Sequence, residues 1–139
     1  MPLVLLVVSF ILLMPFPLLF HRLLTFGRRS EILAIDYLRS QGYRIVCSPY
    51  RTKTGEADVV AWDGDTLAFI EVKSRKNTDP PEDSVGIQKQ QRIIRAANAY
   101  VSRYKLHDKP FRFDILAVTS IPRRKPEFRL LRDAFTIER

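Results

Sequence analysis

The sequence predicts a single mixed α/β domain, with a central sheet between helices, that follows an apolar N-terminal segment. Three observations support this prediction. Segments with helical and strand-like periodicity follow one another in the order α-β-β-β-α-β-β. Asp63-Gly64 separates two apolar strand-like segments, which is a strong hairpin signal. The chain has 139 residues, which suits one domain with a core of its own.

The N-terminal segment, residues 1–26, is predicted to be separate from the domain formed by residues 27–139. Pro2 to Phe20 carries no charge and would span about 28 Å as a helix, close to a bilayer core. Arginines follow this stretch and no basic residue precedes it, so the positive-inside rule predicts a cytoplasmic domain on an inner-membrane anchor. Two prolines weaken this hydrophobic helix. A signal peptide and a start site farther downstream are the alternatives, and the latter leaves a cytoplasmic protein without an anchor.

The first half of the domain combines one helix with three strands. Ser30 is the expected N-cap of the helix, and Gly42 its expected stop. The strands are predicted at Tyr43–Ser48, Glu56–Trp62 and Thr66–Lys73.

The second half begins with a polar loop at residues 74–83 and a long helix over Val85–Tyr104. Its predicted apolar face contains Ile87, Ile94, Ala97, Val101 and Tyr104. Phe111–Val118 alternates as a strand, and Phe128–Leu131 is the predicted last strand.

The charge and the cysteine content limit the binding partners and the kinds of site that the protein can have. Lysine and arginine outnumber aspartate and glutamate by 23 to 15, and such a field attracts nucleic acid or anionic lipid. The single cysteine excludes an intrachain disulfide, and the two histidines argue against a zinc site.

The predicted hairpin places charged residues inside an apolar pattern. If Asp63-Gly64 forms the two-residue loop, counting back along the strands places Glu56 opposite Glu71. Opposed residues share a face, and so do residues two apart on one strand. Four side chains would then project to one side at the open end of the hairpin: Glu56, Asp58, Glu71 and Lys73.

Clustered carboxylates repel one another unless a cation compensates them. Asp58 and Glu71, helped by the backbone carbonyl of Val72, suit Mg²⁺ or Mn²⁺, which bind through one or two carboxylates plus waters and phosphates. Lys73 could orient or deprotonate an attacking water, or hold the scissile phosphate. The alternative is a solvated strand face, because acid-x-Lys is common in strands. The apolar flanks, the hairpin register and the basic body favour the metal site.

The residues also resemble known nucleases. Asp58 followed by Glu71-Val72-Lys73 is similar to the PD-(D/E)XK signature of restriction-endonuclease-like nucleases. The segments YLRSQGYRIV, GEADVVAWDGDTLAFIEVKSR, KQQRIIRAANAYV and FRFDILAV resemble the YraN family over about Arg28 to Phe135. Ser30 stands where that family usually has glycine, and Ala57 replaces a larger apolar residue. The apolar N-terminus is not part of the common pattern.

The resemblance implies a restriction-endonuclease-like core of the Holliday-junction-resolvase type, with a mixed central sheet flanked by helices. It implies that Glu31, on the first helix, joins the metal site and that Lys89 and Gln90 face it. Asp114 matches a late-strand acid, for which a structural and a functional role are both open. The charge pattern adds Arg92, Arg51 and Lys53 as phosphate contacts, and Glu56 as an additional site residue.

The favoured function is therefore a Mg²⁺- or Mn²⁺-dependent endonuclease acting on DNA rather than RNA, including branched DNA. Junction-cleaving relatives suggest a homodimer. Two alternatives remain: a non-catalytic nucleic-acid-binding module that keeps the fold, and a membrane-tethered interaction protein whose charge meets anionic lipid.

Overall fold

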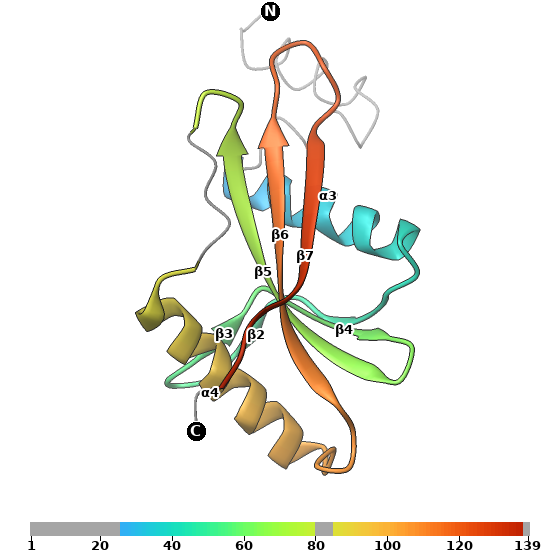
Figure 1. The fold of residues 1–139 in the computed structure, drawn as a ribbon, viewed down its shortest axis with the longest axis vertical. Coiled ribbons are helices and arrows are strands. Elements are labelled where there is room, and N and C mark those ends of the chain that lie inside the picture. Colours follow the sequence, from blue (N-terminus) through green and yellow to red (C-terminus); the bar gives the residue numbers. More distant parts are fainter. Residues whose placement is uncertain (1–25, 80–84, 138–139) are drawn as a thin grey trace, which may run out of the picture.

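A five-stranded mixed sheet with two helices organises the domain (Figure 1). The computed structural model describes residues 26–79 and 85–137, so the apolar segment Pro2–Phe20 lies outside the described residues. Within those ranges no helix is long and apolar enough to cross a membrane. The elements are α3 (Phe26–Ser40), β1 (Arg44–Cys47), β2 (Tyr50–Arg51), β3 (Glu56–Ala57), β4 (Val59–Asp63), β5 (Thr66–Lys76), α4 (Ile87–Arg103), β6 (Phe111–Ser120) and β7 (Glu127–Phe135).

The main sheet has the strand order β1-β4-β5-β6-β7. Strands β5 and β6 pair in parallel, and the other neighbours pair antiparallel. The parallel pair needs a crossover, and the segment containing α4 supplies it. Strands β2 and β3 form a separate two-stranded sheet that packs beside α4. The mixed α/β prediction is confirmed.

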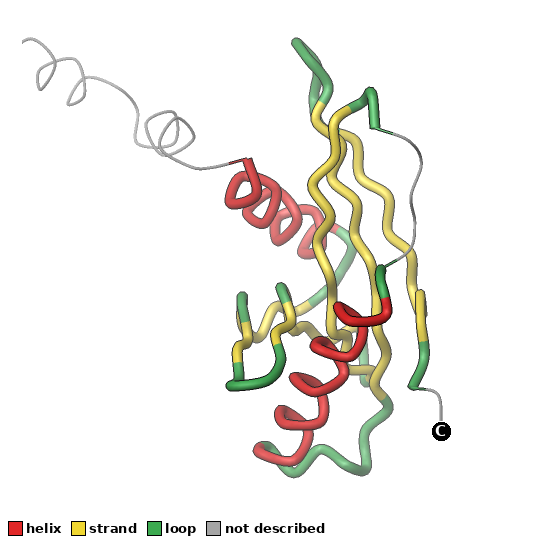
Figure 2. Tube along the Cα trace, turned by 90° about the vertical axis from the view of Figure 1, so that its left-hand side faces the viewer, coloured by secondary structure: helices red, strands yellow, loops and turns green. Residues whose placement is uncertain are grey.

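Each face of the sheet buries its own apolar cluster. Val60, Leu67 and Phe69 pack with α4, whereas Val59, Ala61 and Ile70 pack with α3. Successive strand residues point to opposite faces, so β4 and β5 have to be apolar on both sides. In Figure 2 the helix joined to the grey N-terminal trace, α3, lies beside the upper part of the sheet, and α4 lies beside the lower part.

The first helix begins earlier than predicted. Because α3 starts at Phe26, Ser30 lies inside the helix rather than at its N-cap, and its side chain is buried. The predicted stop is confirmed. Gly42 has a φ of 91°, which favours glycine, and the Tyr43 N–H donates to the Leu38 carbonyl to close the last turn.

The hairpin loop is displaced by one residue from its predicted position. Asp63 pairs with Thr66, so Gly64 and Asp65 form the loop, and Gly64 has the positive φ of 58°. Asp63 stays in the strand, where its Oδ2 accepts a 2.6 Å hydrogen bond from Arg112. The pairing moves by two residues relative to the prediction, which keeps every side chain on its predicted face. Asp58, rather than Glu56, now stands across from Glu71.

The predicted strand Glu56–Trp62 is divided into β3 and β4. Asp58 lies at the division, where the chain passes from the small sheet to the large one. Gly55 permits the small sheet to approach α4, because a Cβ there would lie 2.4 Å from the Arg92 carbonyl oxygen and 2.6 Å from the Ala96 nitrogen. The small sheet was not predicted, although it sets the position of Glu56.

Candidate metal and nucleic-acid site

Asp58 and Glu71 meet on the α4 side of the sheet. Val59 pairs with Ile70, so Asp58, one residue earlier, lies across from Glu71 on the neighbouring strand. The Val72 N–H donates to Asp58 Oδ2 at 2.9 Å, and the Ser48 hydroxyl donates to the Asp58 carbonyl at 2.8 Å. These bonds fix both the backbone and the carboxylate of Asp58. The predicted Val72 contribution was its carbonyl, whereas the observed hydrogen bond uses its N–H.

Glu71 is buried beside Asp58 with an incomplete set of partners. Its residue is 9% exposed, and Oε2 has no hydrogen-bond partner. Lys89 Nζ lies 3.6 Å from the other oxygen, Oε1. Burial, and then the charge of Asp58, raise the pKa of Glu71 to about 8 although Lys89 opposes the shift. A protonated Glu71 can donate to Asp58, whereas two ionised carboxylates cannot satisfy each other.

Glu31, on α3, is influenced by the charge of Asp58. Burial raises the pKa of Glu31, and the negative charges of Asp58 and Glu56 add to the rise, while Arg28 and Arg51 oppose it. Glu31 is therefore within electrostatic reach of Asp58 and Glu56, and its membership of a metal site stays a prediction.

Glu56 forms ion pairs with two of the arginines that were predicted to contact phosphate. Arg51 Nε donates to Glu56 Oε1 at 3.1 Å, and Arg92 NH2 lies 3.7 Å from Glu56 Oε2. One carboxylate thus joins guanidinium groups from β2 and α4. The observed partners of Glu56 are these two arginines.

Three further residues predicted for the site lie at different positions relative to the Asp58–Glu71 pair. Lys73 is half-buried and, two residues after Glu71 on β5, lies on the same face. The Gln90 amide donates to the Val85 carbonyl at 2.7 Å, which ties the first turn of α4 to the residue before its N-cap. Lys53 is exposed in the turn between β2 and β3.

The donors present suit a divalent cation held by two carboxylates. Among residues 26–79 and 85–137, no three aspartate, glutamate, histidine or cysteine side chains form a ready-made metal group. Mg²⁺ commonly binds one or two carboxylates and completes its octahedron with waters and substrate phosphates. The partnerless Glu71 Oε2 beside Asp58 is the donor that such an ion requires.

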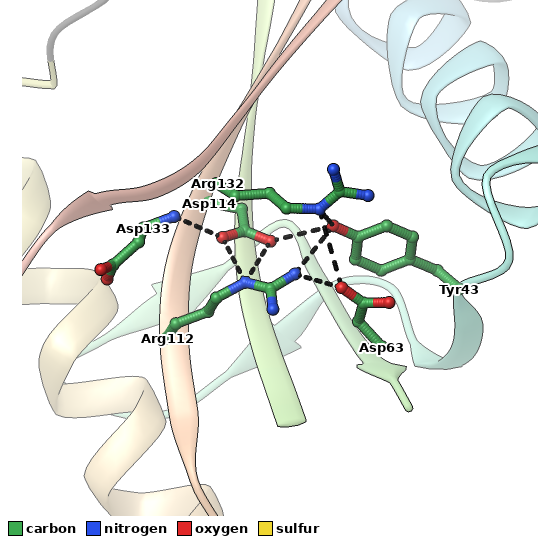
Figure 3. Close-up of polar contacts among 6 residues, drawn as sticks. All are labelled: Tyr43, Asp63, Arg112, Asp114, Arg132 and Asp133. Atoms are coloured by element: carbon green, nitrogen blue, oxygen red, sulfur yellow. Dashed lines mark hydrogen bonds and ion pairs between the residues drawn. The ribbon is translucent and has the colours of Figure 1, made fainter. Parts of the chain in front are cut away.

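Asp114 belongs to a different cluster (Figure 3). It pairs with Ile70 in the parallel register, which places it on the α3 face, opposite to Glu71. The fully buried carboxylate accepts hydrogen bonds from the Tyr43 hydroxyl at 3.2 Å, from Arg112 Nε at 2.9 Å and from the Asp133 N–H at 2.9 Å. Asp114 therefore has a structural role. This ion pair was not predicted from the sequence. Its signal was Arg112, which lies two residues before Asp114 in an otherwise apolar strand and therefore shares its face.

The fold and site define a small mixed α/β protein with paired carboxylates and basic side chains on one side of its sheet. A family model described as "Uncharacterised protein family UPF0102" matches residues 30–118. The chain belongs to UPF0102, which is the YraN family, as the resemblance indicated.

Relatives in this family cover most of the chain. A UPF0102 protein of Solibacter usitatus is 49% identical over 113 residues, covering 78% of this chain and 84% of its own. One of Geotalea uraniireducens is 39% identical over 113 residues, with 80% and 89% covered. One of Chlorobium limicola is 44% identical over 94 residues, with 66% and 73% covered. The similarity to these three relatives thus spans between 66% and 80% of the chain.

Proposed function

We propose that the protein is a divalent-metal-dependent nuclease that hydrolyses phosphodiester bonds in DNA. The observation that carries the proposal is the buried Glu71 carboxylate, which has one oxygen without a partner and Asp58 beside it. Burying two neighbouring carboxylates is unfavourable unless a cation compensates them. The net charge of +8 supports a polyanionic substrate.

Asp58 and Glu71 would hold Mg²⁺ or Mn²⁺. The bound ion would supply positive charge to the scissile phosphate and make the attacking water more acidic. Asp58 is held ready by the Val72 N–H, so its carboxylate needs little rearrangement to bind. Glu31, from α3, would add negative charge near Asp58.

The basic residues around the pair would bind the substrate. Lys89, which now contacts Glu71 Oε1, would turn to a phosphate oxygen once a cation neutralises that carboxylate. Lys73, on the same face of β5, would hold the scissile phosphate or orient water. Arg51 and Arg92, kept in place by Glu56, would contact a neighbouring phosphate.

Cleavage of branched and linear DNA tests this function. Wild-type protein should cut in the presence of Mg²⁺ or Mn²⁺, and we expect Glu71→Ala to reduce the rate by at least about a hundredfold, because the ion loses a ligand. Asp65→Ala, which removes an exposed carboxylate in the hairpin loop, serves as the matched control. Equal rates for Glu71→Ala and wild type would exclude the site.

One observation favours a second candidate function, a nucleic-acid-binding module without catalysis. Lys89 already gives Glu71 a cationic partner at 3.6 Å. A module of this kind would bind DNA with a steep dependence on salt and would not cut it under any metal condition.

A further inference from the structure

A groove on the outer half of the sheet leads away from the candidate site. It has a volume of about 430 Å³ and is lined by Arg75, Lys76, Asn77, Asp79, Ala117, Thr119, Glu127, Phe128 and Arg129. Strands β5, β6 and β7 extend beyond α4 here, and α3 covers the other side of the sheet (Figures 1 and 2). None of the phosphate contacts predicted from the sequence lies in this groove.

The strand register aligns the groove with Glu71. In one row across β5, β6 and β7 lie Lys73, Ala117 and Arg129, and in the next row lie Arg75, Thr119 and Glu127. Glu71 occupies the row before Lys73, so the three rows follow one another at steps of about 7 Å. The groove therefore starts one row from the carboxylate pair and continues in the strand direction.

The side chains form a trough with basic walls. Ala117 and Thr119 on β6 are short, whereas Arg75 on one side and Arg129 on the other are long and cationic. Lys73, two residues before Arg75 on β5, lies between the groove and Glu71. The outer strands flank β6 at about 4.8 Å each, so the strands that carry the two cationic walls run about 10 Å apart. Thr119 and Asn77 add neutral hydrogen-bonding groups of the kind that contact phosphate and sugar.

Two acids belong to the same groove. Asp79 Oδ2 accepts the Lys76 N–H at 2.7 Å, so this carboxylate is used in closing the turn after β5. Glu127 is exposed at the outer end. The row nearest to Glu71 contains two cations and no acid, so the charge favours an anionic strand most strongly beside the candidate site.

We propose that this groove binds the sugar–phosphate backbone of the DNA strand whose scissile phosphate lies at Asp58 and Glu71. The inference rests on the proposed function for its occupant, and it adds Arg75 and Arg129 as substrate-binding residues. They hold the strand along β5 and β6 in the rows that follow Glu71, while Lys73, between Glu71 and Arg75 on β5, remains the residue nearest to the scissile phosphate.

Binding of a fluorescein-labelled DNA fork, followed by fluorescence anisotropy in EDTA, tests the groove without any chemistry. Arg75→Gln/Arg129→Gln should bind about tenfold or more weakly, and the slope of log K against log salt should fall by about 1.4 to 1.8 as two phosphate contacts are lost. Arg103→Gln/Lys109→Gln removes the same charge from exposed positions at the opposite end of α4 and β6, and should bind as tightly as wild type. Arg75→Lys/Arg129→Lys should keep the wild-type slope, and thermal melts of all variants confirm folding.

The outcomes separate the groove from the catalytic proposal. An unchanged affinity and salt slope in Arg75→Gln/Arg129→Gln would overturn the groove, even if Mn²⁺-dependent cleavage still required Glu71. A specific loss of binding in that variant, combined with no cleavage by wild type, would support the groove and reject hydrolysis. A wild-type protein with no measurable affinity for the fork in EDTA would overturn the groove, and Mn²⁺-dependent cleavage would then decide the catalytic proposal on its own.

Discussion

Replacing Asp114 with alanine should destabilise the fold by about 3 kcal/mol, because it leaves buried donors without their acceptor. The carboxylate is 0% exposed and joins Tyr43, Arg112 and the Asp133 N–H (Figure 3). Burial lowers the pKa of Arg112, but its hydrogen bonds to Asp114 and Asp63 outweigh this and raise the pKa above its ordinary value. The guanidinium therefore stays charged and keeps its need for an anionic partner.

Urea unfolding measures this effect. Asp65→Ala removes a carboxylate from the exposed hairpin loop and should change the free energy of unfolding by no more than about 0.5 kcal/mol. Asp114→Asn, which keeps the shape but not the charge, should fall between wild type and Asp114→Ala. A loss of less than about 1 kcal/mol in Asp114→Ala would mean that the network contributes little to stability.

Glu71→Gln should stabilise the metal-free protein at high pH. Below the ordinary glutamate pKa of 4.5, both the folded and the unfolded state carry the proton. Between 4.5 and about 8 only the folded state retains it, so stability falls as the pH rises, by up to about 1.4 kcal/mol per pH unit. Above about 8 the whole penalty of the ionised Glu71 is present.

Denaturation in EDTA at several pH values tests this slope. Glu71→Gln and wild type should be similarly stable near pH 5, and the variant should gain a few kcal/mol over wild type by pH 8. Glu127→Gln, at an exposed carboxyl on β7, should follow wild type throughout. If the free energies of unfolding of Glu71→Gln and wild type changed in parallel with pH, the pKa of Glu71 would not be raised in the folded protein.

Local patterns predicted most of the fold. The alternation in β6, the apolar hairpin strands and Gly42 each predicted an element correctly, because each depends on neighbours in the sequence. The buried face of α4 was predicted less well. Ile87 and Tyr104 are 72% and 50% exposed, whereas Ile93, Ala96 and Tyr100 are buried, because the packing of α4 against β3 and β5 sets its rotation.

The candidate site was predicted in part. Strand periodicity brought Asp58 and Glu71 to one face, and that result survived the loop error because the shift was two residues. The small β2–β3 sheet depends on the long-range contact of Gly55 with α4. The ion pairs of Glu56 with Arg51 and Arg92 therefore could not be predicted from neighbouring residues in the sequence. The Asp63–Arg112 ion pair likewise joins residues far apart in the sequence, whereas its second half, Arg112–Asp114, joins residues two apart on one strand.

Calorimetric titration of the metal-free protein with Mn²⁺ at neutral pH measures directly whether the Asp58–Glu71 pair holds a cation. Wild type and Glu127→Gln should each bind about one ion per chain, while Asp58→Asn and Glu71→Gln should each lose that binding, since two carboxylates form the protein's share of the site. Absence of binding by wild type, or binding that persists unchanged in both Asp58→Asn and Glu71→Gln, would contradict the assignment of a metal site to this pair.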